Sequence, residues 1–132
     1  MFEKNKKSKY YSKRVLIDGH SFDSKLEGDY YLYLKSYFIP FDMQPKIYLT
    51  SAKILYKPDF FIKIDDSYYV DVKGSPRMET ASFKIKKRLW QEYGPAPLAL
   101  VMRERGEWKT YETITPGHDK VGDSGDDQGK GA

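Results

Sequence analysis

The stretch PDFFIKIDDSYYVDVKG, residues 58–74, determines how this chain folds. Two apolar, β-branched and aromatic runs flank the polar segment 65–67, which is typical of a turn between strands. We therefore predict a β-hairpin with strands over residues 57–64 and 68–73. The second strand ends where glycine and proline follow it.

Two acids and a lysine occupy neighbouring positions on this hairpin. Asp71 and Lys73 lie two residues apart, so both side chains leave one face of the strand, while Val70 and Val72 anchor the other. Asp59 stands at the start of the first strand, and the hairpin brings it towards Asp71. Paired carboxylates repel unless a cation lies between them, and Mg²⁺ prefers oxygen ligands and retained waters. We expect a metal site with Lys73 at a water or a phosphate; the alternative is a pair of solvated acids beside a surface lysine.

Upstream, the pattern predicts a small hairpin and a helix. Residues 14–22 contain two short β-type runs around the turn signal Asp18-Gly19. A helix then follows, capped by Ser24 or Asp23 and ending near Phe38. Its expected buried face consists of the apolar residues at helical spacing, which are Leu26, Tyr30, Leu34 and Tyr37.

The remaining elements complete the order of the fold. Residues 44–49 are predicted as a strand before the central hairpin, and residues 78–93 as a helix after it. The expected apolar side of this helix consists of Ile85, Leu89 and Tyr93. Strands over 98–102 and 108–111 follow. The order α-β-β-β-α-β, after a small N-terminal hairpin, predicts an α/β layer sandwich.

Composition limits the class of protein. The chain has 132 residues, 16% aromatics and no cysteine, which excludes disulfide frameworks, thiolate zinc sites and cysteine nucleophiles. No apolar run reaches the roughly 18 residues of a membrane span, and no secretory signal is visible. We expect one domain over 14–114, a flexible basic arm over 1–13, and a disordered Gly/Asp-rich tail over 115–132.

Charge is unevenly distributed along the chain. The net charge is +4, but the predicted tail contains four Asp and two Lys, so the remainder carries +6. A basic body indicates a polyanionic partner, most often nucleic acid, although many domains are this basic for other reasons.

The motifs together resemble the PD-(D/E)XK nuclease superfamily. Pro58-Asp59 and Asp71-Val72-Lys73 match its core motif, and the order of elements matches its restriction-endonuclease-like core of a mixed sheet flanked by helices. Further similarity to a small phage- and prophage-encoded branch covers about residues 14–102. The segments that carry it are FDSKLE at 22–27, QP at 44–45, YKPDF at 56–60, DVKG at 71–74 and FKIKKRLW at 83–90. The endonuclease subunit of some bacterial transposases is also similar, but it has a further DNA-binding domain that we do not expect in this chain.

This resemblance implies a set of site residues. Glu27, Asp59, Asp71 and the Val72 carbonyl would bind Mg²⁺, which Mn²⁺ would replace, and Lys73 would act on the attacking water. Many relatives have Glu where this chain has Asp71, and that shorter side chain affects metal preference or rate.

Other polar residues have two interpretations each. By the resemblance, Gln44 would support the metal shell, or else it caps a strand end. The basic residues of the second helix and the arm contact DNA phosphates in one interpretation and are ordinary solvated surface in the other. These candidate DNA-binding residues are Lys84, Lys87, Arg88, Lys13 and Arg14.

The resemblance implies a Mg²⁺-dependent DNA endonuclease, a hydrolase of phosphodiester bonds, in the cytoplasm of a bacterial host. We expect a structure-specific enzyme of the Holliday-junction-resolving type that serves phage recombination or replication. A homodimer suits two symmetric nicks. The alternatives are a nuclease-fold DNA-binding module that does not cut, and a nuclease subunit of a transposase-like or restriction-like assembly.

Overall fold

The computed structural model describes residues 14–117, so Lys13, the basic arm and most of the predicted tail lie outside the described residues. Residues 115–117, expected to begin the tail, are described, and Pro116 and Gly117 are buried. The chain divides into two compact units, one ending at Pro40 and one beginning at Phe41. No helix among the described residues is long and apolar enough to cross a membrane.

The first unit begins with the predicted hairpin. Strands β1 (Val15–Ile17) and β2 (His20–Phe22) pair antiparallel. Asp18 and Gly19 between them have φ values of 54° and 80°. Positive φ at both central residues defines the type I′ turn, which matches the twist of the strands, so the Asp-Gly signal predicted this hairpin correctly.

Helix α2 (Lys25–Ser36) follows, and the Ser24 hydroxyl caps it by accepting the N–H of Glu27 at 3.1 Å. Tyr30 and Leu34 are buried as predicted. Tyr37 is 67% exposed, because the helix has already ended before it. The expected assignment of Tyr37 to the buried face is therefore wrong.

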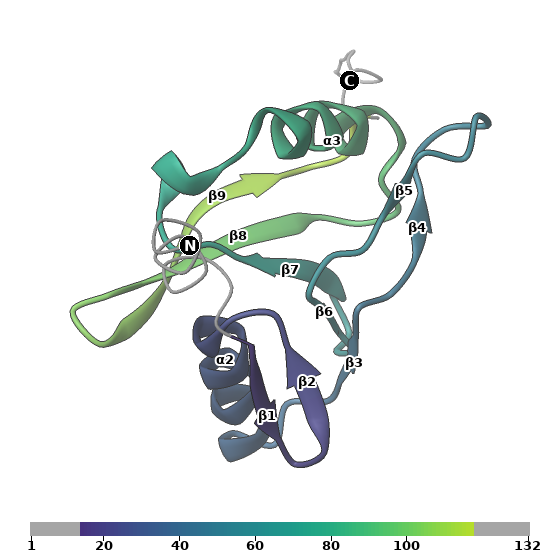
Figure 1. Ribbon diagram of the computed structural model, residues 1–132. Helices are drawn as coiled ribbons and strands as arrows, with labels where there is room; N and C mark the ends of the chain where they lie inside the picture. Colours follow the sequence, from purple (N-terminus) through teal and green to yellow (C-terminus); the bar gives the residue numbers. More distant parts are fainter. Residues whose placement is uncertain (1–13, 118–132) are drawn as a thin grey trace, which may run out of the picture. The chain divides into compact units, whose positions relative to one another are not determined.

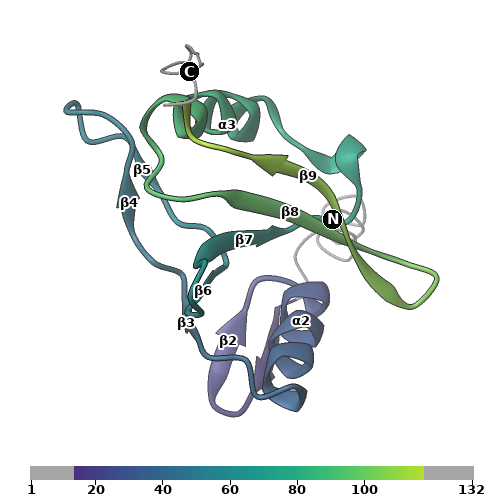
Figure 2. The same cartoon turned by 180° about the vertical axis from the view of Figure 1, so that it is seen from behind.

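The second unit is built on a five-stranded sheet with the order β3-β6-β7-β8-β9 (Figures 1 and 2). Its strands are β3 (Phe41–Met43), β6 (Phe60–Ile62), β7 (Tyr68–Val72), β8 (Leu98–Glu104) and β9 (Glu107–Ile114). Only β7 and β8 pair in parallel, and the 3₁₀ turn η1 (Pro76–Met78) and helix α3 (Ala81–Tyr93) connect them. The predicted mixed α/β class is confirmed, with a mostly antiparallel sheet.

Helix α3 packs on one face of this sheet through Leu89, as predicted, and through two aromatic residues that were not predicted. Phe83 and Trp90 are buried, and the Trp90 indole N–H donates to the Ala96 carbonyl at 2.8 Å. Ile85 and Tyr93, expected on the apolar side, are 61% and 56% exposed. The larger aromatic residues set the buried side of the helix, because they remove more apolar surface from water.

A long hairpin precedes the predicted one in the same unit. Strand β4 (Ile47–Tyr48) pairs with β5 (Leu55–Tyr56), and β3 pairs with β6 in the same continuous register. The predicted strand at 44–49 is shortened to β4, and the predicted strand at 57–64 is shortened to β6. At the break this register places Pro45 opposite Pro58, and neither has an N–H for the ladder.

Candidate acidic site

Three polar residues lie in a row across neighbouring strands of the second unit. The register of β3 with β6 places Gln44 opposite Asp59, and the Gln44 N–H donates to the Asp59 carbonyl at 2.9 Å. The pairing of Phe60 with Val70, continued by one residue, places Asp59 opposite Asp71. The two acids therefore lie close on the face of the sheet that α3 covers, because directly opposite residues share a face.

Asp71 is the centre of this site. The carboxylate is 5% exposed, and one of its oxygens accepts the hydroxyl of Tyr56 while the other lies 3.0 Å from Lys73 Nζ. The same Nζ lies 3.9 Å from the centre of the Phe83 ring. The lysine charge is thus held between a carboxylate and an aromatic face, in an environment with little water.

Asp59 is fixed by the backbone of the neighbouring strand. The ladder between β6 and β7 ends at Phe60 and Val70, and beyond it the Val72 N–H donates to Asp59 Oδ2 at 2.7 Å. The carboxylate replaces a strand carbonyl as acceptor. This bond orients Asp59 beside the strand that carries Asp71.

A second polar cluster adjoins the first on the same side of the sheet. Glu79 follows η1, and its side chain is 4% exposed; it accepts from Lys87 Nζ at 2.8 Å and from the Tyr111 hydroxyl at 2.6 Å. Lys87 also lies 2.9 Å from Glu112. Tyr111 is an extra residue in the pairing of β8 with β9, and such a bulge turns adjacent side chains of one strand towards the same side.

The pKa values show how strongly these groups interact. Burial, the charge of Asp71 and the hydrogen bond to it raise the pKa of Tyr56 well above its ordinary value, so the hydroxyl remains a donor at neutral pH. Burial opposes ionisation of Glu79, but the bonds from Lys87 and Tyr111 outweigh it and lower the pKa of Glu79. The charge of Lys73 contributes to the same lowering, which links the two clusters electrostatically.

The other predicted site residues that the structure describes belong to other elements of the two units. Glu27 lies in the first turn of α2, in the first unit. Lys84 and Arg88 are exposed on α3. Lys87, expected at the DNA surface, is instead half-buried between two glutamates and borders a pocket of 290 Å³. Arg14 is exposed and pairs with Asp23.

The paired carboxylates suit a hard divalent cation. Each carboxylate oxygen has two lone pairs, so an oxygen that accepts one hydrogen bond retains a position for a metal. Mg²⁺ is commonly held by one or two carboxylates and keeps several waters, which Asp59, Asp71 and the Val72 carbonyl match in chemistry. Among residues 14–117, no group of three or more His, Cys, Asp or Glu side chains lies close enough to hold a metal.

Sequence reasoning missed Tyr56, Glu79 and Tyr111. Tyr56 has a signal in the sequence, because it stands directly before the Lys-Pro-Asp segment that contains Asp59. Glu79 and Tyr111 meet only through the bulge in β9, a feature without a local pattern.

One comparison with known proteins gave a match. The model of a family described as "Protein of unknown function (DUF1064)" matches residues 7–109. Neither the curated proteins nor the solved structures contain a significant match to the chain.

Proposed function

The chain belongs to the DUF1064 family, and we propose that it is a Mg²⁺-dependent DNA endonuclease that hydrolyses phosphodiester bonds. One observation carries this proposal: the register of β6 with β7, continued by one residue, places Asp59 opposite Asp71, and Lys73 Nζ lies 3.0 Å from Asp71. A pair of acids, of which Asp71 is buried, beside one ammonium group is an arrangement that a divalent cation and a phosphate would complete.

The cation would be held by Asp59, Asp71 and the Val72 carbonyl. Mg²⁺ bound there would supply positive charge to the phosphate oxygens and promote deprotonation of a water. Mn²⁺ has the same preference for oxygen ligands and would replace it. Glu27 of the first unit is proposed as a further ligand, on the strength of the motif it shares with the nuclease superfamily.

Lys73 is the proposed catalytic lysine. Its Nζ is placed by Asp71 and by the Phe83 ring, and its side chain is 21% exposed, so it is accessible at one end. From this position the ammonium group would orient the attacking water or stabilise the charge on the phosphate. Tyr56 would act as a positioning residue, since its hydroxyl fixes one Asp71 oxygen.

Branched DNA is the proposed substrate, and a homodimer the proposed assembly. Two active sites related by a two-fold axis suit paired nicks in a four-way junction. Such an enzyme would act in phage recombination or replication, in the cytoplasm of a bacterial host.

The test is cleavage of matched linear, single-stranded, flapped and four-way-junction DNA in Mg²⁺, with the cuts mapped. We expect symmetric nicks in the junction by the wild type and none by Lys73→Ala. Lys109→Ala is the matched control, because Lys109 is exposed and pairs only with Glu104 among the described residues. Binding of DNA without hydrolysis in Mg²⁺ or Mn²⁺ would refute the proposal.

A further inference from the structure

The β4–β5 hairpin of the second unit presents an unusual outer face. Ile47 and Tyr56 pair across the hairpin and turn inward. Tyr48 and Leu55 form the next pair and turn outward, with 57% and 36% of their surfaces exposed. An exposed aromatic opposite an exposed aliphatic residue forms a small apolar platform.

Lysines flank this platform on the same face. Lys46 and Lys57 are opposite each other in the register, each two residues from the platform, and both are exposed. Lys53 is exposed near the tip.

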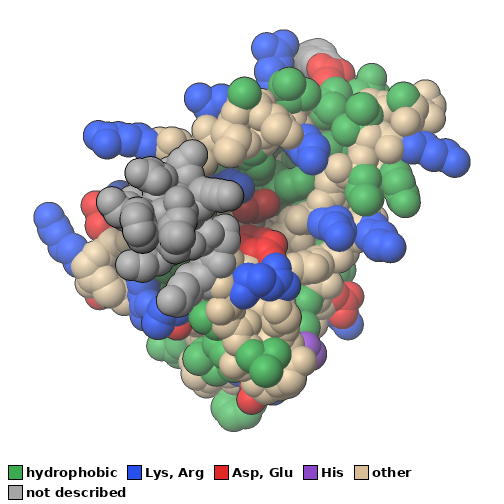
Figure 3. Space-filling view, viewed as in Figure 1, with side chains coloured by type: hydrophobic (Ala, Val, Ile, Leu, Met, Phe, Trp, Pro, Cys, Tyr) green, Lys and Arg blue, Asp and Glu red, His purple; other side chains and the backbone are tan. Residues whose placement is uncertain are grey.

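Among the described residues, these lysines have no acidic partner. Residues 43–58 contain three lysines and no Asp or Glu. Within residues 14–117, none of the three lysines forms an ion pair, whereas Lys63, Lys87 and Lys109 of the same unit each have an acidic partner. Figure 3 shows hydrophobic and basic side chains beside one another at the right of the view, where Figure 1 places β4 and β5. The hairpin therefore carries a local positive charge that a polyanion would complement.

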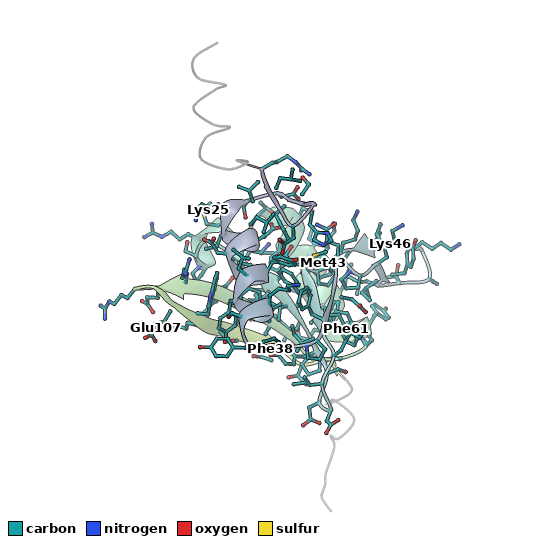
Figure 4. All side chains as sticks on the ribbon, turned by 90° about the horizontal axis from the view of Figure 1, so that it is seen from below. Lys25, Phe38, Met43, Lys46, Phe61 and Glu107 are labelled. Atoms are coloured by element: carbon teal, nitrogen blue, oxygen red, sulfur yellow. The ribbon has the colours of Figure 1, made fainter. Side chains whose placement is uncertain are left out.

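The β4–β5 hairpin adjoins the acidic site. Tyr56 of β5 donates its hydroxyl to Asp71. Lys46 and Lys57 lie between the platform and the break at Pro45 and Pro58, and Gln44 and Asp59 follow directly beyond that break. Figure 4 labels Lys46 on this hairpin, at the opposite end of the second unit from Glu107.

We propose that this face binds an unpaired DNA strand next to the phosphodiester bond that is cut. Its phosphates would lie on Lys46 and Lys57, and a base would stack on Tyr48. An aromatic ring stacks on any unpaired base but has no access to a base inside a duplex. This inference rests on the proposed nuclease function and assigns to the branched substrate an unpaired segment at its branch point.

The experiment measures binding of fluorescent single-stranded and duplex DNA by polarisation, in EDTA so that no cutting occurs. Tyr48→Ala should weaken binding to the single strand about 10-fold and leave duplex binding unchanged. The double variant Lys46→Gln/Lys57→Gln should reduce the slope of log affinity against log salt by about 1.4, at about 0.7 for each phosphate contact on a single strand. Lys109→Gln is the matched control and should behave as the wild type.

Two outcomes would overturn the assignment. The assignment is wrong if the hairpin variants bind single-stranded DNA as tightly as the wild type does. It is also wrong if Tyr48→Ala loses as much affinity for duplex DNA as for single-stranded DNA. Wild-type cleavage of junction DNA in Mg²⁺, measured in parallel, separates the claims. If the wild type cuts but the hairpin variants bind normally, the hairpin assignment alone fails; if the wild type neither binds nor cuts DNA, both fail.

Discussion

The hydroxyl of Tyr56 is the most informative single group to remove. Tyr56→Phe deletes only the oxygen that donates to the buried Asp71 carboxylate and keeps the ring against Trp90, where the ring centres are 5.7 Å apart. Asp71 retains its contact with Lys73. The substitution therefore tests one hydrogen bond without creating a large cavity.

The expected cost follows from the charge and burial of the acceptor. A hydrogen bond to a charged group contributes about 1.5–3 kcal/mol, and Asp71 is 5% exposed, so water cannot replace the lost donor. We expect Tyr56→Phe to lower the free energy of unfolding by about 2 kcal/mol. For a domain of about 100 residues this corresponds to a fall in Tm of roughly 10 °C.

The assay is urea unfolding followed by circular dichroism at pH 7, with Tm measured by calorimetry. Tyr48→Phe is the matched control, because Tyr48 belongs to the same hairpin and is 57% exposed. Its stability should stay within about 0.5 kcal/mol of the wild type. If Tyr56→Phe is also within that range, the hydroxyl does not stabilise Asp71 and the reasoning is wrong.

Three further predictions concern the second unit. The pKa of Glu79 is lower in the folded than in the unfolded protein, so ionised Glu79 stabilises the fold above about pH 4.3 and this stabilisation is lost as the pH falls. Glu79→Gln should lower the free energy of unfolding at pH 7 and reduce its dependence on pH in the acid range. An unchanged dependence on pH would contradict this. Trp90→Ala should cost about 3–5 kcal/mol in urea unfolding, since Trp90 is completely buried, and a cost below 1 kcal/mol would contradict its place in the core. Arg105→Gly should raise the free energy of unfolding by about 0.5–1 kcal/mol, and Tm with it, because Arg105 has a φ of 53° in the turn before Gly106. A lower Tm would refute this.

Local patterns predicted the elements whose signals are short-range. The Asp18-Gly19 turn requires positive φ at both residues, and Asp and Gly are two of the residue types that adopt positive φ most readily. The central hairpin was predicted for a similar reason, because its turn residues lie between two strongly β-forming runs. Its register, which places Asp59 opposite Asp71, depends on packing that the sequence does not express locally.

The features that were missed depend on contacts distant in sequence. Ile85 and Phe83 both fit a helical period, so the local pattern does not show which of them α3 buries. The packing of the helix on the sheet decides this, and it buries Phe83. The proline break is visible only once Pro45 and Pro58 are known to be opposite each other. Lys87 appeared to be a surface cation, and its two acidic partners come from residues 8 and 25 positions away.

The central claim is that Asp59 takes part in Mg²⁺-dependent hydrolysis of DNA. The most direct measurement is the single-turnover rate of junction cleavage by Asp59→Asn, whose amide oxygen can still accept the Val72 N–H. Asp42→Asn is the control, because Asp42 is an exposed acid of the same unit. We predict that Asp59→Asn cuts about 10²–10³-fold more slowly, that the control matches the wild type, and that EDTA abolishes all cutting. A wild-type rate for Asp59→Asn, or cleavage that persists in EDTA, would contradict the claim.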